Sequence, residues 1–354
     1  MICILSQAFF EGSTEAVCEW LRSWNVEAIR LNADDIEVHG ALTAQVDSDS
    51  SQVWVTIDGK VIGTREIRAV WYRKWNSSKG VSNGSPDGER GRIFADPSHE
   101  NRTNTLLVYK HLTNEFKVAA DFLFAALQGA NWLGRPAQSQ PNKLEVLRKA
   151  RACGFDIPAT LVTSNPDDLM RFRSRHGTIV TKPLSDILIC YGDSNSSFST
   201  YTAVVPGDFI QLEGWKGGGA PSLFQEYLSK KYEVRTFYLD GRCYSMAMYT
   251  QFNESTRVDS RHYNVRTRSV PFSLNREEVE CTRNLMNSLC LDTGSLDFVK
   301  TTDDRFVFLE VNPLGQFGML SGNCNYRLEE KVARALVARD QAGTVDPIRN
   351  VGSY

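Results

Sequence analysis

The sequence lacks the features that mark several large classes of protein. It has no apolar run of membrane-spanning length, and its first residues show neither a basic leader nor a cleavage site. Its eight cysteines and five histidines are dispersed, without a CxxC pair, which argues against a disulfide framework and against zinc. A phosphate-binding loop of the form GxxxxGK(S/T) is also missing. We therefore expect a cytoplasmic protein with buried thiols and no membrane partner.

An excess of either charge is missing as well. The chain of 354 residues has 40 Lys+Arg and 42 Asp+Glu, a formal net charge of −2. A general nucleic-acid binder needs a basic surface, so we expect no nucleic-acid partner, and any anion site must be local. The hydrophobic content of 42% is typical of a globular protein, and the length suggests two or three domains.

Short apolar strands alternate with amphipathic helices, which predicts an α/β (α+β) fold. Strands are expected at 2–6 and 69–72, and Asp58-Gly59 is expected to form a hairpin turn. The alternation indicates an N-terminal α/β domain over roughly 1–135. A second unit then starts with a helix over 142–153, which Gly154 should end.

The stretch 297–316 carries the clearest chemical signal. Glu310 and Asn312 are two residues apart in a predicted strand and share a face, and Asp297 should lie on the neighbouring strand across the turn at 303–304. Two carboxylates and a carboxamide suit Mg²⁺, which also binds nucleotide phosphates. The alternative interpretation is a solvated strand end with a polar turn.

A second signal lies in the two strands before it. The end of the strand predicted over 223–228 carries Gln225, Glu226, Tyr227 and Leu228. Backbone groups there can bind a planar base. Glu233 and Arg235 share a face of the next strand, so Glu233 can accept from ribose hydroxyls while Arg235 binds a phosphate or a developing oxyanion. The alternative is a cross-strand salt bridge on a solvated face.

Cationic residues give weaker signals. Lys182 closes an apolar strand and Lys143 begins a helix, where a cation can neutralise phosphate, although most lysines are simply surface residues. The stretch 257–268 packs four arginines with one acid and is either a site for carboxylates or phosphates or a basic surface loop. The aromatic and cationic run 71–75 is either a plug between domains or part of a site wall.

Taken in order, these features resemble an ATP-grasp ligase. The runs TEAVCEWL at 14–21, WYR at 71–73 and FLEVNPLGQFGMLSGNCNY at 308–326 resemble, more narrowly, the grasp-with-spasm peptide maturases, which belong with the microviridin-type ligases among the graspetide synthetases. The similarity extends to about residue 340. It implies an ATP-grasp fold with an N-terminal domain (1–135), central (136–222) and C-terminal (223–342) grasp subdomains, and a tail (343–354).

The resemblance also implies a reaction and its partners. ATP would phosphorylate Asp or Glu side chains of a ribosomal precursor peptide, and a Ser/Thr hydroxyl or a Lys amine of that peptide would displace phosphate to close an ester or amide ring. ATP and Mg²⁺ are the implied cofactors. The implied partner is a leader peptide with an acidic core, and the enzyme would be a cytoplasmic homodimer.

The resemblance assigns roles residue by residue. Lys143 and Lys182 would hold phosphates, 225–228 adenine and Glu233 the ribose, with Mg²⁺ on Asp297, Glu310 and Asn312. Arg235 would stabilise the transferring phosphoryl group. The peptide would be bound by Arg261, which anchors an acidic side chain, and by Asp259 and Arg73.

Two other functions stay open at this point. An ATP-grasp ligase could instead add an amino acid to a small molecule or to a protein terminus. A nucleotide-binding regulator or leader-peptide carrier would have no turnover, and it would have no need of Arg235 and three metal-site oxygens.

Overall fold

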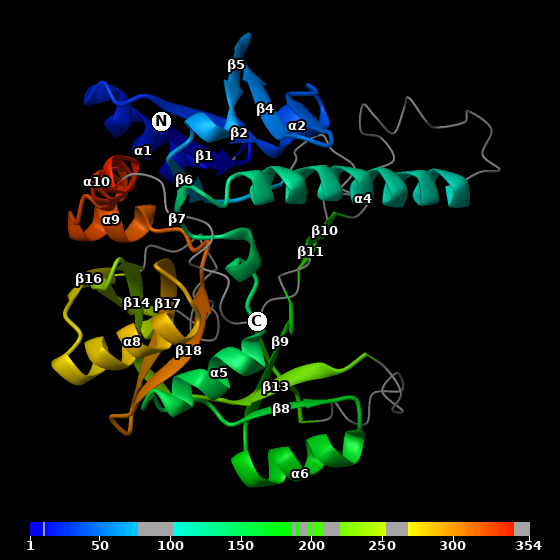
Figure 1. Ribbon diagram of the computed structural model, residues 1–354. Coiled ribbons are helices and arrows are strands. Elements are labelled where there is room, and N and C mark those ends of the chain that lie inside the picture. Colours follow the sequence, from blue (N-terminus) through cyan, green and yellow to red (C-terminus); the bar gives the residue numbers. More distant parts are fainter. Residues whose placement is uncertain are drawn as a thin grey trace. The chain divides into compact units, whose positions relative to one another are not determined.

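The computed structural model describes residues 1–9, 11–76, 102–185, 189–191, 197–199, 202–207, 220–252 and 268–342. Contacts divide the chain into two units. Unit 1 comprises Met1–Ser139, Gln316–Gly322 and Tyr326–Tyr354, and unit 2 comprises Gln140–Gly315 and Asn323–Asn325. Figure 1 shows the elements of both units. The division predicted from the sequence, at 135, 222 and 342, stays a prediction.

Unit 1 is built around a parallel sheet with the strand order β2-β1-β6-β7. Its described elements are β1 (Ile2–Ser6), α1 (Gly12–Ser23), β2 (Ala28–Asn32), α2 (Ala33–Glu37), β3 (Leu42–Val46), β4 (Ser51–Ile57), β5 (Lys60–Gly63), β6 (Ala69–Tyr72), α4 (Arg102–Ala126), β7 (Asn131–Leu133), α9 (Gly318–Cys324, up to Gly322) and α10 (Leu328–Gln341). The strands predicted at 2–6 and 69–72 are confirmed as β1 and β6. All five residues of β1 are buried, as the central position of the strand requires.

A three-stranded antiparallel sheet, β3-β4-β5, belongs to the same unit. Asp58 and Gly59 join β4 to β5 with φ of 50° and 76°, so the predicted hairpin turn is confirmed. The helix α10 packs against α1 and β6, which brings the C-terminal part of the described chain back onto the N-terminal sheet (Figure 1).

Unit 2 contains two antiparallel four- and five-stranded sheets, with the orders β12-β9-β13-β8 and β16-β15-β14-β17-β18, and a β10-β11 hairpin. Its described elements are α5 (Lys143–Ala152), β8 (Thr160–Thr163), α6 (Pro166–His176), β9 (Ile179–Lys182), β10 (Ile189–Tyr191), β11 (Ser197–Ser199), β12 (Ala203–Val204), β13 (Ser222–Glu226), β14 (Lys230–Leu239), β15 (Arg242–Tyr249), β16 (Arg268–Phe272), α8 (Arg276–Ser288), β17 (Thr293–Thr301) and β18 (Phe306–Asn312).

Local signals explain where α5 begins and ends. The Asn142 side chain accepts hydrogen bonds from the backbone N–H groups of Leu144 and Glu145, which satisfies the first turn. Gly154 adopts φ of 101°, a conformation that disfavours a side chain, just after the helix. The predicted helix and its stop are therefore confirmed.

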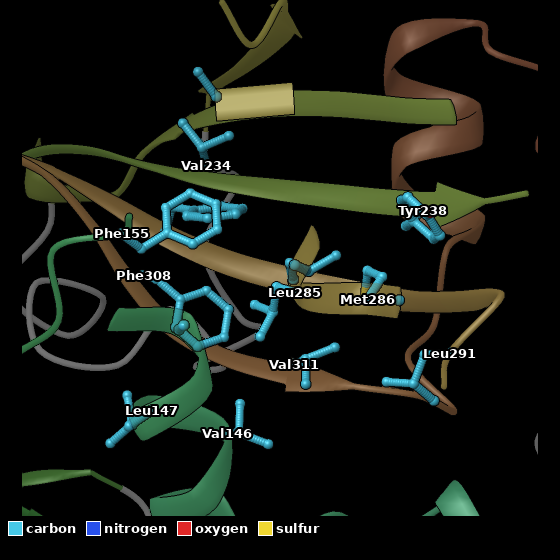
Figure 2. Packing of buried hydrophobic residues seen from close by; sticks show 14 residues of the cluster. Val146, Leu147, Phe155, Val234, Tyr238, Leu285, Met286, Leu291, Phe308 and Val311 are labelled. Carbon is cyan, nitrogen blue, oxygen red and sulfur yellow. The ribbon is translucent and has the colours of Figure 1, made fainter. Parts of the chain in front are cut away.

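One face of the five-stranded sheet is apolar and packs against α5 and α8. Val234, Phe308 and Val311 point into this cluster, together with Val146 of α5 and Leu285 of α8 (Figure 2). Since side chains alternate along a strand, the residues between them lie on the opposite face. That opposite face carries the charged residues of the candidate site.

A β-bulge decides which face Glu310 occupies. The pairing register shifts between Asp297 and Phe298 of β17. Asp297 pairs with Glu310 of β18, whereas Phe298 pairs with Phe308, so β18 has one extra residue at this point. Without the extra residue, Phe308 and Glu310 would share the apolar face. The bulge turns Glu310 to the face of Asp297, a use of bulges that is common beside active sites.

No helix in the described residues is long and apolar enough to span a membrane. The cysteines whose burial is described are free thiols, and the prediction that they are buried holds only in part: Cys3 and Cys324 are buried, Cys290 is exposed, and the other four are intermediate. The described part of the chain holds no group of three or more His, Cys, Asp and Glu residues that could bind a metal by themselves.

Candidate active site

Three charged residues lie side by side across the five-stranded sheet. Arg235 of β14 pairs in register with Asp297 of β17, and Asp297 pairs with Glu310 of β18. Arg235 binds Asp297 with two hydrogen bonds, Nε to Oδ1 at 2.7 Å and Nη2 to Oδ2 at 2.8 Å. Both side chains are about a fifth exposed, so this charged pair is open to a ligand at one side. The structure thus brings a predicted phosphoryl-binding cation and two predicted metal ligands together.

Asn312 continues this face at the end of β18. It pairs with Ser295, two residues before Asp297, and its Oδ1 accepts from the backbone N–H of Leu314 at 2.9 Å. Gly315 then packs so tightly that a Cβ built there would lie 2.4 Å from Ser295 Cβ. The turn that follows the predicted ligand therefore has one defined shape.

Lys182 approaches the same face from the four-stranded sheet. Its Nζ lies 3.8 Å from Glu310 Oε2, and its side chain is only 12% exposed. Lys143 instead donates to the carbonyl oxygens of Pro183, at 2.9 Å, and Ser185, at 2.6 Å, just beyond Lys182. Lys182 is thus the last residue of β9, and the ammonium group of Lys143 lies beside the residues that follow it.

The predicted base-binding residues form the end of β13 and its exit. Gln225 is buried and donates from Nε2 to Thr160 Oγ1 at 2.9 Å, while Glu226 accepts from the backbone N–H of Ala159 at 3.1 Å. The N–H of Tyr227 donates to the carbonyl of Thr178. The strand ends at Glu226, earlier than the predicted Leu228, so Tyr227 and Leu228 belong to the connection to β14.

Glu233 does not pair with Arg235, although the two share a face. Its Oε1 accepts from Lys230 Nζ and, at 2.9 Å, from Thr250 Oγ1. Lys230 and Glu233 are nearly buried, with side chains 8% and 12% exposed. Glu233 and Arg235 therefore have separate partners, and Arg235 forms a cross-strand salt bridge with Asp297, as the alternative interpretation had it.

Arg73 lies in unit 1, in a buried ionic cluster rather than on an open surface. Its Nε is 3.2 Å from Glu11 Oε2, and Lys74 Nζ is 2.7 Å from Glu11 Oε1. Gln316 donates to the same Oε1 at 2.7 Å, and Ser13 donates to Gln316. Burial by itself would raise the pKa of Glu11, but Arg73 and Lys74 outweigh it and hold that pKa below its ordinary value. Burial lowers the pKa of Arg73, which Glu11 partly offsets.

The remaining predicted residues, Arg261 and Asp259, lie outside the described residues, as does nearly all of the basic stretch 257–268. Sequence reasoning missed Lys230, Thr250, Ser295 and Glu11. Lys230 and Glu233 are three residues apart, a spacing that does not pair side chains in a regular strand. The irregular register between Lys230 and Tyr232 brings them together, and no local pattern announces it.

The oxygen set on this face fits a divalent cation. Each carboxylate oxygen of Asp297 takes one Arg235 donor and keeps acceptor capacity, and Glu310 lies directly opposite in register. In addition, Ser295 Oγ is buried and has no hydrogen-bond partner among the described residues. This hydroxyl oxygen is therefore a further polar atom on the same face that a ligand would satisfy. Hard oxygen donors of this kind suit Mg²⁺.

Comparisons with known proteins show which fold this is. Residues 1–86 match the family described as the MvdD pre-ATP grasp domain. Macrocyclase MdnC from Microcystis aeruginosa, solved with its precursor peptide MdnA, superposes with a TM-score of 0.76 at 22% identity, covering 96% of this chain and 100% of that one. The chain has the ATP-grasp fold.

Two further ATP-grasp ligases superpose over almost their whole length. A RiPP-associated ATP-grasp ligase of Chryseobacterium gregarium, in complex with ADP and a leader and core peptide, matches at TM-score 0.79 and 24% identity, covering 96% of each chain. PsnB, in complex with a phosphomimetic variant of its minimal precursor, Mg and ADP, matches at TM-score 0.70 and 18% identity, covering 96% of this chain and 98% of that one. No curated protein sequence matches.

Proposed function

We propose that the protein is an ATP-dependent peptide ligase that closes rings within a ribosomally made precursor peptide. ATP would activate an Asp or Glu side chain of the peptide, and a Ser/Thr hydroxyl (ester) or a Lys amine (amide) would displace phosphate. The observation that carries the proposal is the row of Arg235, Asp297 and Glu310, with Lys182 beside it, on the polar face of the five-stranded sheet. The pre-ATP grasp match and the folds of the three peptide-bound ligases support it.

The residues divide the chemistry between them. Lys143 and Lys182 bind the nucleotide phosphates, the connection after β13 holds the adenine, and Glu233 accepts from the ribose. Asp297, Glu310 and Asn312 hold Mg²⁺, which, when bound, offsets the negative charge of the phosphates. Asp297 holds Arg235 in one orientation, and the guanidinium stabilises an oxygen that gains charge in the reaction.

The proposed reaction consists of two displacement steps. A side-chain carboxylate oxygen of the peptide attacks the γ-phosphorus of ATP, the bond to the β-phosphate oxygen breaks, and ADP leaves. The hydroxyl or amine then attacks the acyl carbon, loses its proton, and phosphate departs with the bond electrons. Water must be excluded between the two steps, because the acyl phosphate would otherwise hydrolyse.

Peptide recognition is assigned to Arg73, Arg261 and Asp259. Arg73 alone of these lies in the described residues, where Glu11 and Lys74 make a cluster with one net positive charge. Arg73 and Glu11 are buried, so Lys74, with its side chain 25% exposed, is the member of this cluster that an acidic core peptide would contact. We also propose that the enzyme is a homodimer and that it acts in the cytoplasm.

Intact-mass measurement with purified protein, ATP, Mg²⁺ and a candidate precursor peptide tests the function. The candidate is the product of a short neighbouring gene with a segment rich in Thr/Ser and Asp/Glu. A loss of one water per linkage, with one ADP formed for each, is expected. Glu310→Gln should abolish ADP formation while the circular dichroism spectrum stays unchanged.

A ligase that joins an amino acid to a small molecule or a protein terminus is the second candidate, because it would use the same nucleotide site. It predicts an unchanged peptide mass and ADP formation only when free amino acids are added. That outcome would reject the macrocyclase.

A further inference from the structure

The hydroxyl of Ser295 is a buried polar group on the charged face of the five-stranded sheet. Ser295 is 3% exposed, and its Oγ has no hydrogen-bond partner among the described residues. The pairing of β17 is regular from Ser295 to Asp297, so both side chains lie on the same face, opposite the buried Leu296 between them. A buried hydroxyl without a partner costs free energy, so it calls for an explanation.

The neighbours of Ser295 in the sheet explain why the described residues do not satisfy this hydroxyl. On the β14 side it pairs with Phe237, whose side chain has no polar atom. On the β18 side it pairs with Asn312, whose Oδ1 accepts from the backbone N–H of Leu314. The turn after Asn312 closes over the hydroxyl, since a Cβ at Gly315 would lie 2.5 Å from Oγ. The hydroxyl therefore lies beneath the turn that carries a predicted cation ligand.

A cation bound at this face would keep several of its water molecules. The described residues hold no group of three His, Cys, Asp and Glu side chains that could bind a metal, so the protein supplies few ligands here. These are the carboxylates of Asp297 and Glu310 and the amide oxygen of Asn312. Mg²⁺ takes about six ligands and gives up water reluctantly. Water on a cation is a strong hydrogen-bond donor that needs an acceptor in the protein, and a serine hydroxyl is such an acceptor.

We propose that Ser295 is a positioning residue of the cation site, whose hydroxyl accepts a hydrogen bond from a water molecule on the cation. The inference rests on the cation site of the proposed function and adds one residue to it. Ser295 does not bind the cation directly. It fixes one of the cation's waters from a strand that is paired on both sides. Because this bond forms only when the cation is bound, its free energy adds to the affinity for the cation.

Binding of Mn²⁺ to the full-length protein in the presence of ADP measures the effect. Mn²⁺ suits the same oxygen ligands as Mg²⁺, and electron paramagnetic resonance follows its free form directly. Ser295→Ala removes the hydroxyl and should bind Mn²⁺ about tenfold more weakly than the wild type, as is typical when a residue that orients a metal's ligands is lost. Unchanged affinity for Mn²⁺ in Ser295→Ala would overturn the inference.

Urea unfolding separates this role from a purely structural one. Without a cation, Ser295→Ala removes a buried hydroxyl that has no partner, so the midpoint of unfolding should stay the same or rise. With Mn²⁺ and ADP at fixed concentrations, the midpoint of the variant should rise by less than that of the wild type. A midpoint that falls without the cation, with an unchanged rise on addition of Mn²⁺ and ADP, would mean that the hydroxyl only supports the fold. That result would also overturn the inference.

Ser245→Ala is the matched control. Ser245 is 2% exposed and lies in β15 of the same sheet, but on the apolar face, and its hydroxyl is bonded to that of Thr236 at 2.7 Å. This variant should bind Mn²⁺ like the wild type and unfold at a lower urea concentration, the reverse of the pattern expected for Ser295→Ala. If Ser295→Ala does not fold, Ser295→Gly also lacks the hydroxyl and supplies the same affinity test. Wild-type affinity in Ser295→Gly would count against the inference in the same way.

The outcomes separate this inference from the proposed function. A protein that binds Mn²⁺ with ADP, loses affinity in Ser295→Ala and does not change any peptide rejects the ligase and keeps the inference. A protein that cyclises peptide, with a Ser295→Ala variant that keeps its affinity for Mn²⁺, rejects the inference and keeps the ligase. Wild-type protein that does not bind Mn²⁺ in the presence of ADP rejects both.

Discussion

Gly315→Ala is the substitution whose effect the structure specifies most closely. A Cβ at this position would lie 2.4 Å from Ser295 Cβ, 2.5 Å from Ser295 Oγ and 3.0 Å from the carbonyl oxygen of Asn312. Ordinary contacts begin at 3.4 Å, so one side must move by about 1.0 Å, the difference between 3.4 and 2.4. Overpacking of this size in a buried place costs about 1–3 kcal/mol.

Either Ser295 or the turn at Gly315 must move to relieve the clash. Ser295 is buried in β17, which forms hydrogen-bonded ladders with β14 on one side and β18 on the other. The turn at Gly315 has a backbone hydrogen bond from its N–H to Asn312, beyond the end of the ladder. The turn is therefore the softer side, and Asn312 moves with it. A displacement of about 1 Å at a positioned group can lower the turnover rate by about 100-fold.

Two measurements check this reasoning. Urea unfolding should show a loss of about 1–3 kcal/mol, and the Mg²⁺ concentration at half-maximal ADP release should rise severalfold. Gly322→Ala is the control, because its Cβ would meet nothing within 4 Å and its position is helical. It should be neutral or slightly stabilising. If Gly315→Ala matched Gly322→Ala in stability and in Mg²⁺ dependence, the assignment of Asn312 to the metal site would lose its support.

Three further predictions concern single side chains. Arg235→Lys keeps the charge but cannot donate two parallel hydrogen bonds to Asp297, and ADP release should fall by about 100-fold without a change in the circular dichroism spectrum. Glu11→Gln tests the buried cluster: since the folded pKa of Glu11 lies below the ordinary 4.5, its contribution to stability is present above about pH 4.5 and is lost as the pH falls through the folded pKa. Urea unfolding should therefore show a larger difference between wild type and Glu11→Gln at pH 7 than at pH 3.5. Asn142→Ala removes the cap of α5 and should cost about 1 kcal/mol, measured by the same unfolding assay.

Much of the fold could be predicted because local signals determine it. The hairpin at Asp58-Gly59 and the helix stop at Gly154 each depend on the chemistry of one or two residues, and the structure confirms both. The shared face of Glu310 and Asn312 follows from the two-residue period of a strand, which holds from the bulge to the end of β18.

The features that could not be predicted are all non-local. The charged partner of Arg235 is Asp297, 62 residues away, rather than its neighbour Glu233. The Glu11 cluster joins residues more than 300 positions apart through Gln316. The return of α10 to the first unit depends on contacts with α1 and β6 that leave no periodic trace in either segment. Such partners are set by the order of strands in the sheets and not by local propensity.

The charge arrangement of the candidate site has a consequence for how its ligands bind. Along the row, Arg235 and Lys182 supply two positive charges, and Asp297 and Glu310 supply two negative ones, so the row is neutral by itself. A cation that binds the carboxylates weakens their hold on the two side-chain cations and leaves these freer to bind phosphate. In the proposed nucleotide site, phosphates on Lys182 and Arg235 would release the carboxylates for a cation in the same way. The two ligands therefore favour each other, and by linkage each raises the affinity of the other by the same factor. A balanced row of this kind should bind Mg²⁺ weakly without nucleotide and tightly with it, which separate titrations with and without ADP would measure.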